Sequence, residues 1–145
     1  MSPKILVSSC LVGEKCAYDG RARTSDAVRV LCERVGCVLI CPEMAGGLGC
    51  PRKAHEITAG DTAADVLKGR ARVLSSCGED HTDNFVRGAG AALREARANR
   101  ITMAIMKSRS PSCGKGSVYS GRFDPSTQAP ALARSLRSGF RTPGR

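Results

Sequence analysis

The sequence predicts an α/β layered fold with a mainly parallel sheet, in a single domain that spans residues 1–145. Three short apolar runs, at 4–8, 37–40 and 101–106, have the composition of buried strands. Segments with helical spacing lie between them, and this alternation is typical of parallel sheets covered by helices. At 145 residues the chain can bury one core without disulfides or metals as supports.

The first predicted strand, 4–8, runs directly into Ser9-Cys10. A turn-rich segment follows, in which Tyr18-Asp19-Gly20 has the composition of a structural turn. Thr24 is then placed to cap a helix, and Gly36 is placed to end it. The apolar face expected for this helix consists of Ala27, Val28, Leu31 and Val35.

The second strand, 37–40, is continuously apolar, as expected of a strand covered on both faces. It ends at Cys41. The segment 44–52 is rich in glycine and bounded by prolines, which predicts an irregular loop. Residues 54–80 show weak periodicity, with a short strand expected near 71–74.

Thr82 is placed to cap another helix that ends near Asn99 and turns Phe85, Ala89, Leu93 and Ala96 inward. The third strand, 101–106, leads toward Cys113. A last helix is expected around 128–138, with Leu132 and Leu136 inward. The order of elements predicts a Rossmann-like arrangement, in which ligands bind outside the carboxyl ends of the strands.

Each of the three predicted strands leads to a cysteine at that edge of the sheet: Cys10, Cys41 and Cys113. Converging thiolates suit zinc, copper(I) or an iron–sulfur cluster. A structural zinc site usually takes four ligands, often in C-x-x-C pairs, and the chain has no such pair. A four-iron cluster held by three cysteines would keep one iron open as a Lewis acid. On spacing alone, zinc and iron–sulfur both remain open.

Composition limits the other classes of function. The first ten residues contain too short an apolar run for a signal peptide or a membrane span, so we expect a cytoplasmic protein. The net charge of +10 can attract nucleic acid, but the basic residues are scattered and aromatic residues make up only 3 % of the chain. A basic RNA-binding protein stays an alternative because of the charge. The sequence predicts nothing about the oligomeric state.

Three motifs resemble the signatures of the thiouracil desulfurase family: SSCLVGEKCAYDG, CPEMAGGLGCPR and SRSPSCGKGSVYSG. The resemblance covers roughly residues 4–123, and the last ~22 residues diverge from the family pattern. It implies a [4Fe–4S] cluster held by Cys10, Cys41 and Cys113. It further implies a small-molecule substrate, 2-thiouracil or a related thiolated pyrimidine, whose sulfur is captured on the open iron and replaced by water without net redox change.

The same resemblance implies that Glu43 is the acid/base and that Ser110 assists near the substrate; we rank Ser112 below Ser110. A thiolated RNA is an alternative substrate, and we favour the small molecule. A different class of function is a non-catalytic zinc or iron–sulfur module that stabilises the fold or senses redox state. Glu43 would then merely cap a helix beginning at Met44.

The remaining candidates have plainer interpretations. Cys32 and Cys37 are expected to pack in the interior. Cys16 and Cys50 lie in the motif loops, where a spare or resolving thiol is the alternative to packing, and Cys77 is assigned no role. Solvated surface charge is the expectation for Arg52 and Lys107, ahead of binding an anionic part of the substrate. His55 and His81 are expected to be isolated surface or capping residues.

Overall fold

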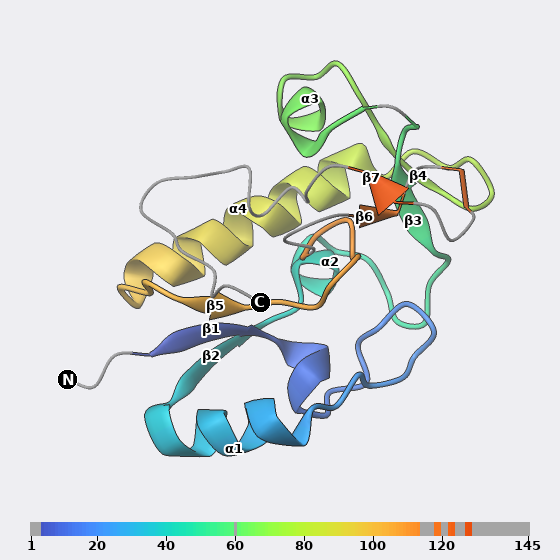
Figure 1. Cartoon of the computed structure of the whole chain (residues 1–145). Coiled ribbons are helices and arrows are strands. Elements are labelled where there is room, and N and C mark those ends of the chain that lie inside the picture. The colour runs from blue at the N-terminus through green and yellow to red at the C-terminus, as the bar shows by residue number, and fades with distance from the viewer. Residues whose placement is uncertain (1–3, 60, 114–117, 120–121, 124–126, 129–145) are drawn as a thin grey trace.

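The structure is a computed structural model that describes residues 4–59, 61–113, 118–119, 122–123 and 127–128. Strands and helices alternate over most of this range (Figure 1). In chain order the elements are β1 (Ile5–Ser8), the 3-10 helix η1 (Ser9–Val12), α1 (Asp26–Val35), β2 (Cys37–Ile40), α2 (Pro42–Ala45), β3 (His55–Ile57), α3 (Ala63–Leu67), β4 (Val73–Ser75), α4 (Thr82–Ala98), β5 (Ala104–Ile105), β6 (Val118–Tyr119) and β7 (Thr127–Gln128).

The central sheet has three parallel strands in the order β2-β1-β5. Leu6 of β1 is paired with Val38 on one side and Ala104 on the other. In Figure 1 the strands lie between α1, below them, and α4, above them. The prediction of an α/β fold with a mainly parallel sheet is confirmed, whereas the narrower Rossmann-like description stays a prediction. Two antiparallel pairs, β3–β4 and β6–β7, were not expected.

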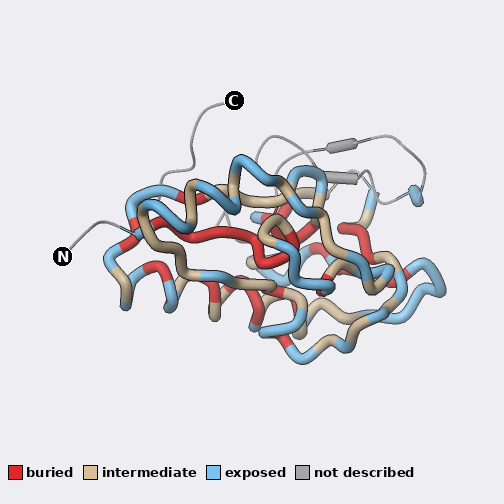
Figure 2. Tube along the Cα trace, turned by 90° about the horizontal axis from the view of Figure 1, so that it is seen from below, coloured by how far each residue is buried: buried red, intermediate tan, exposed pale blue. Residues whose placement is uncertain are grey.

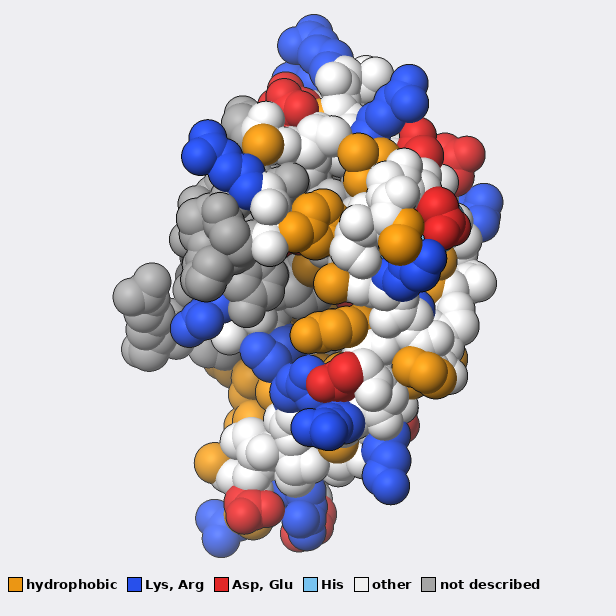
Figure 3. Space-filling view, turned by 90° about the vertical axis from the view of Figure 1, so that its right-hand side faces the viewer, with side chains coloured by type: hydrophobic (Ala, Val, Ile, Leu, Met, Phe, Trp, Pro, Cys, Tyr) orange, Lys and Arg blue, Asp and Glu red, His pale blue; other side chains and the backbone are white. Residues whose placement is uncertain are grey.

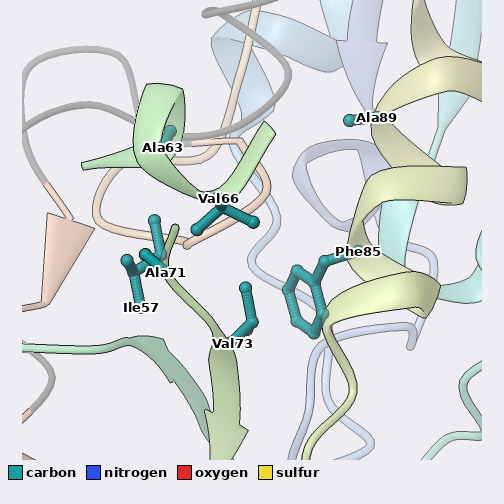
Figure 4. Packing of buried hydrophobic residues seen from close by; sticks show 7 residues of the cluster. All are labelled: Ile57, Ala63, Val66, Ala71, Val73, Phe85 and Ala89. Carbon is teal, nitrogen blue, oxygen red and sulfur yellow. The ribbon is translucent and has the colours of Figure 1, made fainter. Parts of the chain in front are cut away.

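Two groups of buried side chains form the core. Figure 2 colours buried residues red along the chain trace, and the segments around them are intermediate or exposed. Leu6 packs with Ala96, Ile101 and Ala104, so that α4 covers one face of the parallel sheet. The second group joins α3 and the β3–β4 pair to the first half of α4, around Phe85 (Figure 4). Its buried members are Ile57, Ala63, Val66, Ala71, Val73, Phe85 and Ala89.

Several helix predictions are wrong in detail. Ser25, not Thr24, caps α1, because its side chain accepts the Val28 N–H at 3.4 Å. None of the residues of α1 is buried, so its expected apolar face is only partly covered. At α4 the cap is His81 and Thr82 is the first helical residue. The segment expected to be irregular around 44–52 begins inside the short helix α2.

The weakly periodic region holds three short elements, of which only the strand near 71–74 was expected; it is β4, shifted by one or two residues. The start of helix α3 is marked in the sequence by a capping box. Thr62 accepts the Asp65 N–H while the Asp65 carboxylate accepts the Thr62 N–H. The helix expected at 128–138 lies outside the described residues, except that Gln128 ends β7.

The interpretation of Cys32 and Cys37 as separately packed thiols is wrong. The two form a disulfide, with Cα atoms 5.1 Å apart. Gly36 turns the chain directly from α1 into β2 with a φ of +79°, and this reversal places the last turn of the helix beside the first residue of the strand. A spacing of five residues across a helix-ending glycine was the available signal.

Two glycines let α2 and α4 approach very closely. A Cβ on Gly88 would overlap the carbonyl oxygen of Pro42, and a Cβ on Gly46 would overlap the carbonyl oxygen of Asn84. The Asn84 side chain also donates a hydrogen bond to the Gly46 carbonyl at 2.8 Å. The backbone of α2, which directly follows β2, is therefore fixed against α4 without side chains between them.

Replacing Gly88 by alanine should therefore destabilise the fold by about 1–3 kcal/mol, the usual cost of overpacking a well-packed contact. Gly90→Ala is the matched control. Its Cβ would meet only the far end of the Arg94 side chain at 3.3 Å, and alanine is the better helix former by roughly 0.5–1 kcal/mol. Urea unfolding of both variants measures the difference, and the midpoint of Gly88→Ala should be the lower one. Equal midpoints would contradict the close approach of α2 and α4.

Candidate active site

A cavity of about 340 Å³ lies at the carboxyl ends of the three parallel strands. Residues directly after β1, β2 and β5 line it, together with the loop before α1 and the segment around β3. Parallel strands deliver their carboxyl ends to one edge of a sheet, which is why segments so distant in sequence share this cavity. The predicted site residues that line it are Cys10, Cys41, Cys113, Glu43 and Ser110.

The three cysteines expected to converge all lie at this cavity, each on a different element. Cys10 is on η1 and Cys41 is the residue between β2 and α2, while Cys113 follows β5 after a turn. Cys10 and Cys113 are each only 8 % exposed, so little water reaches either thiol. The structure therefore brings the three together, and their role as ligands stays a prediction.

Burial dominates the electrostatics of these thiols. It raises the pKa of Cys113 to about 12, although hydrogen bonds from the Ser8 and Ser112 hydroxyls act in the opposite direction. Burial, and then the neighbouring Cys41, also raise the pKa of Cys10. Left alone, such thiols hold their protons, so several thiolates in this cavity need a positive group to bind them. Soft sulfur donors in a dry site fit a thiophilic metal or an iron–sulfur cluster.

Ser8 is a site residue that the sequence analysis missed. It is 2 % exposed at the end of β1, and its hydroxyl accepts the Lys107 N–H at 2.8 Å. The same hydroxyl donates to the Met106 sulfur at 3.7 Å. Ser8 thus ties the end of the central strand to the segment that carries the third cysteine. Its place in the first motif, two residues before Cys10, was the available signal.

Glu43 lies in the first turn of α2 and is held by two partners. Its Oε1 accepts a hydrogen bond from Arg52 Nε at 3.3 Å, and its Oε2 accepts one from Ser112 Oγ at 3.1 Å. Ser112 Oγ in turn lies 3.0 Å from Ser110 Oγ. A continuous chain of hydrogen bonds therefore joins the carboxylate to both serines of the third motif. Ser112, which we ranked second, is the serine in direct contact with Glu43.

Arg52 is not the solvated surface charge that we expected. Its side chain is 6 % exposed and that of Glu43 is 13 % exposed, so the ion pair is largely shielded from water. The guanidinium also donates to the carbonyls of Cys16 at 2.9 Å and Gly49 at 3.1 Å. Burial alone would lower the Arg52 pKa, but the charge of Glu43 and the hydrogen bond to it raise the pKa. Lys107, by contrast, is half-buried at the cavity wall.

The two histidines are not isolated, which corrects the sequence-based expectation. His55 Nε2 lies 2.7 Å from His81 Nδ1, and His55 is only 5 % exposed and lines the cavity. Burial, and then the proximity of His81, lower the pKa of His55. Beside it, the buried carboxylate of Glu56 accepts the Phe123 N–H at 2.6 Å. His81 occupies the N-cap position of α4, but its side chain makes no capping hydrogen bond.

The free cysteines outside the predicted ligand set lie in different surroundings. Cys16 is buried and lines the cavity, whereas Cys77 is exposed and does not line it. The Cys50 thiol donates to the carbonyls of Lys15 at 3.1 Å and Ala17 at 3.4 Å, so it braces the loop that carries Cys16. Among the described residues, no three His, Cys, Asp or Glu side chains lie close enough to hold a single metal ion. A four-iron cluster spreads its ligands wider than one ion does, and the cavity is compatible with it.

Comparison with known proteins decides the family. Residues 5–138 match the family model described as 2-thiouracil desulfurase. This chain belongs to the 2-thiouracil desulfurase family. A relative in Bacillus subtilis (strain 168), the uncharacterized protein YbbK, is 42 % identical over 119 residues, which cover 82 % of this chain and 78 % of that protein. The solved structure of the [4Fe-4S]-dependent thiouracil desulfidase TudS superposes with a TM-score of 0.78 at 36 % identity, covering 92 % of this chain and 83 % of that one.

The family model reaches beyond the third motif, into the tail in which the motif comparison found no resemblance. The desulfurase fold is therefore common to this chain and TudS over most of their lengths. Within the part of the chain that the structure covers, no helix is both long and apolar enough to cross a membrane.

The substitution Arg52→Lys tests whether the contacts of the Arg52 guanidinium stabilise the structure of the site. Lysine keeps the charge but lacks the planar donors that reach Glu43 and two carbonyls at once. We expect a loss of about 1–3 kcal/mol in unfolding free energy, the cost of leaving buried partners unsatisfied. Arg29→Lys is the control, because its pair with Asp26 is exposed and should change stability by less than about 0.5 kcal/mol. Equal losses in the two variants would show that Arg52 has no special structural role.

Proposed function

We propose that this chain is a [4Fe–4S]-dependent desulfurase that converts 2-thiouracil, or a related thiolated pyrimidine, to the oxygen analogue and sulfide. The observation that carries the proposal is the meeting of three strand-end cysteines with a buried carboxylate in one cavity. Membership of the desulfurase family and the likeness to TudS support it. Cys10, Cys41 and Cys113 are the proposed ligands.

A bound [4Fe–4S] cluster with three protein ligands supplies one iron that can polarise the thiocarbonyl and take the departing sulfide. The overall change is hydrolytic: one water enters, and its oxygen replaces the sulfur, which leaves as hydrogen sulfide. No electron donor or acceptor is consumed. The protein's own contribution is therefore to position the substrate, to exclude other water and to move protons.

Glu43 is the proposed acid/base. Its carboxylate lines the cavity two residues from the Cys41 ligand, and the contacts to Arg52 and Ser112 fix both of its oxygens. From there it can take a proton from the attacking water and return it to the leaving sulfur or a ring nitrogen. Ser110, linked to Glu43 through Ser112, is the proposed hydrogen-bond partner of the substrate.

The size and surroundings of the cavity favour a free base over RNA. A volume of about 340 Å³ is at the lower end of small-molecule sites and would have to hold the cluster as well, which suits a single ring. Figure 3 shows one face of the molecule, on which most Lys and Arg side chains stand apart or beside acidic ones, although a few adjoin one another below the centre. A spread charge gives a weaker attraction for a polyanion than a clustered one. We further propose that the whole chain works as one domain in the cytoplasm.

Anaerobic purification followed by incubation with 2-thiouracil tests the proposal. We expect about four irons and four sulfides per chain, and equal amounts of uracil and released sulfide without added reductant. Serine in place of Cys10, Cys41 or Cys113 should abolish both the cluster and turnover, while Cys77→Ser, an exposed thiol outside the cavity, serves as the control.

Glu43→Gln separates an enzyme from a non-catalytic module. Glutamine keeps the shape of the side chain: its carbonyl oxygen can accept from Arg52 and its amide N–H can donate to the Ser112 hydroxyl, so the iron content should stay near wild type. The rate should nevertheless fall by roughly 10²–10⁴, the range of general acid–base catalysis. Bound zinc in place of iron, or a full cluster with no effect of this substitution on turnover, would favour a structural or redox-sensing module instead. Salt-sensitive RNA binding without turnover would favour the RNA-binding alternative.

A further inference from the structure

Two aromatic side chains at the wall of the cavity stay exposed. Among the large hydrophobic residues that remain exposed in the described chain, only Tyr18 and Phe123 line the cavity. Tyr18 is 48 % exposed and Phe123 is 42 % exposed, whereas Phe85 is buried in the core. An exposed aromatic ring forgoes the free energy of burial, so a ring kept at a cavity wall can gain it from a ligand there.

The backbone of Phe123 has an unusual conformation. Its φ is +55°, in the left-handed region that a bulky residue other than glycine rarely adopts. Such a conformation costs free energy and persists only where the surrounding structure fixes it. Residues of this kind are concentrated at active sites and at sites that hold ligands. Phe123 thus differs from an ordinary exposed loop residue in its backbone as well as in its place at the cavity.

A buried carboxylate holds Phe123 in this conformation. Glu56 Oε2 accepts the Phe123 N–H at 2.6 Å, and Glu56 is only 5 % exposed in the middle of β3. β3 is paired with β4, and β6, which precedes Phe123 in the chain, lies beside β3 (Figure 1). Hydrogen bonds to a carboxylate are roughly twice as strong as those between neutral groups. The fold therefore fixes Phe123 at the cavity wall through a strong contact to a paired strand.

The substrate of the proposed function has a shape that suits such a ring. The polar atoms of a pyrimidine lie on its edge, within reach of groups such as Glu43 and Ser110, while its two faces carry none. Those faces stack favourably on aromatic side chains. Resting on the proposed function, we propose that Phe123 is a specificity-determining residue, whose ring stacks on the pyrimidine ring and selects planar rings over saturated ones.

The binding of two ring compounds to the anaerobic, cluster-loaded full chain tests the stacking. Uracil is planar, whereas 5,6-dihydrouracil carries the same carbonyl and N–H groups on a puckered ring. In isothermal titration calorimetry, wild type should bind uracil more tightly than dihydrouracil. Phe123→Ala should weaken the binding of uracil by about 5- to 100-fold, the range expected when a stacked base loses its aromatic partner. The binding of dihydrouracil should change much less.

Kinetics with 2-thiouracil separate stacking from a structural role. In Phe123→Ala the KM should rise by a similar factor, while kcat and iron content stay near wild type. Phe123→Leu keeps an apolar side chain without the ring and should behave like the alanine variant, whereas Phe123→Tyr keeps the ring and should restore most of the affinity. Val30→Ala is the control, because Val30 is 45 % exposed on α1 and does not line the cavity.

Unchanged affinity for uracil in both Phe123→Ala and Phe123→Leu, each with a full cluster, would overturn the stacking and leave the proposed function intact. An equal loss of affinity for uracil and dihydrouracil would also overturn it, since it would indicate a general disturbance of the cavity. If the alanine variant does not fold, the contrast between the leucine and tyrosine variants decides in the same way. A wild type whose uracil binding depends on Phe123, but which releases no sulfide from 2-thiouracil, would overturn the proposed function instead.

Discussion

The parallel pairing of three short strands is the constraint on which the candidate site depends. β1 lies in the centre, with β2 and β5 on either side, and all three run in the same direction. Since each strand is followed at once by its motif, the pairing brings Cys10, Cys41 and Cys113 to one edge of the sheet. The packing of Leu6 against α4 fixes the sheet on which this convergence rests.

The sheet alone does not position the acid/base candidate, because Glu43 lies on α2, outside the sheet. Two constraints hold it there. Gly46 and Gly88 allow α2 to sit directly on the backbone of α4, and Arg52 joins the Glu43 carboxylate to the loop around Cys16. A buried cation that touches a carboxylate and two carbonyls couples the position of the acid to that of the thiols. Substrate positioning, proton transfer and cluster binding therefore share one rigid frame.

The features that depend on local sequence pattern could be predicted. Apolar runs of four to six residues predicted the three parallel strands, and the cysteine after each predicted the site's edge. Features that tertiary contacts decide could not be predicted: His55 becomes buried only because His81 and Phe85 pack against it. The disulfide between Cys32 and Cys37 depends on the angle at Gly36, and the burial of Arg52 depends on three segments that meet around it. The contacts of His55 with His81 and of Arg52 with Cys16 join segments far apart in the chain, so no local pattern reports them.

The central claim is that three cysteines hold a cluster with one iron available to the substrate's sulfur. Mössbauer spectra of the ⁵⁷Fe-loaded protein, recorded under anaerobic conditions before and after 2-thiouracil is added, test it most directly. The account predicts a [4Fe–4S] spectrum in which a single iron changes its parameters when substrate binds, while the other three stay as they were. A spectrum that substrate leaves unchanged, or iron that is absent from a folded protein, would contradict it.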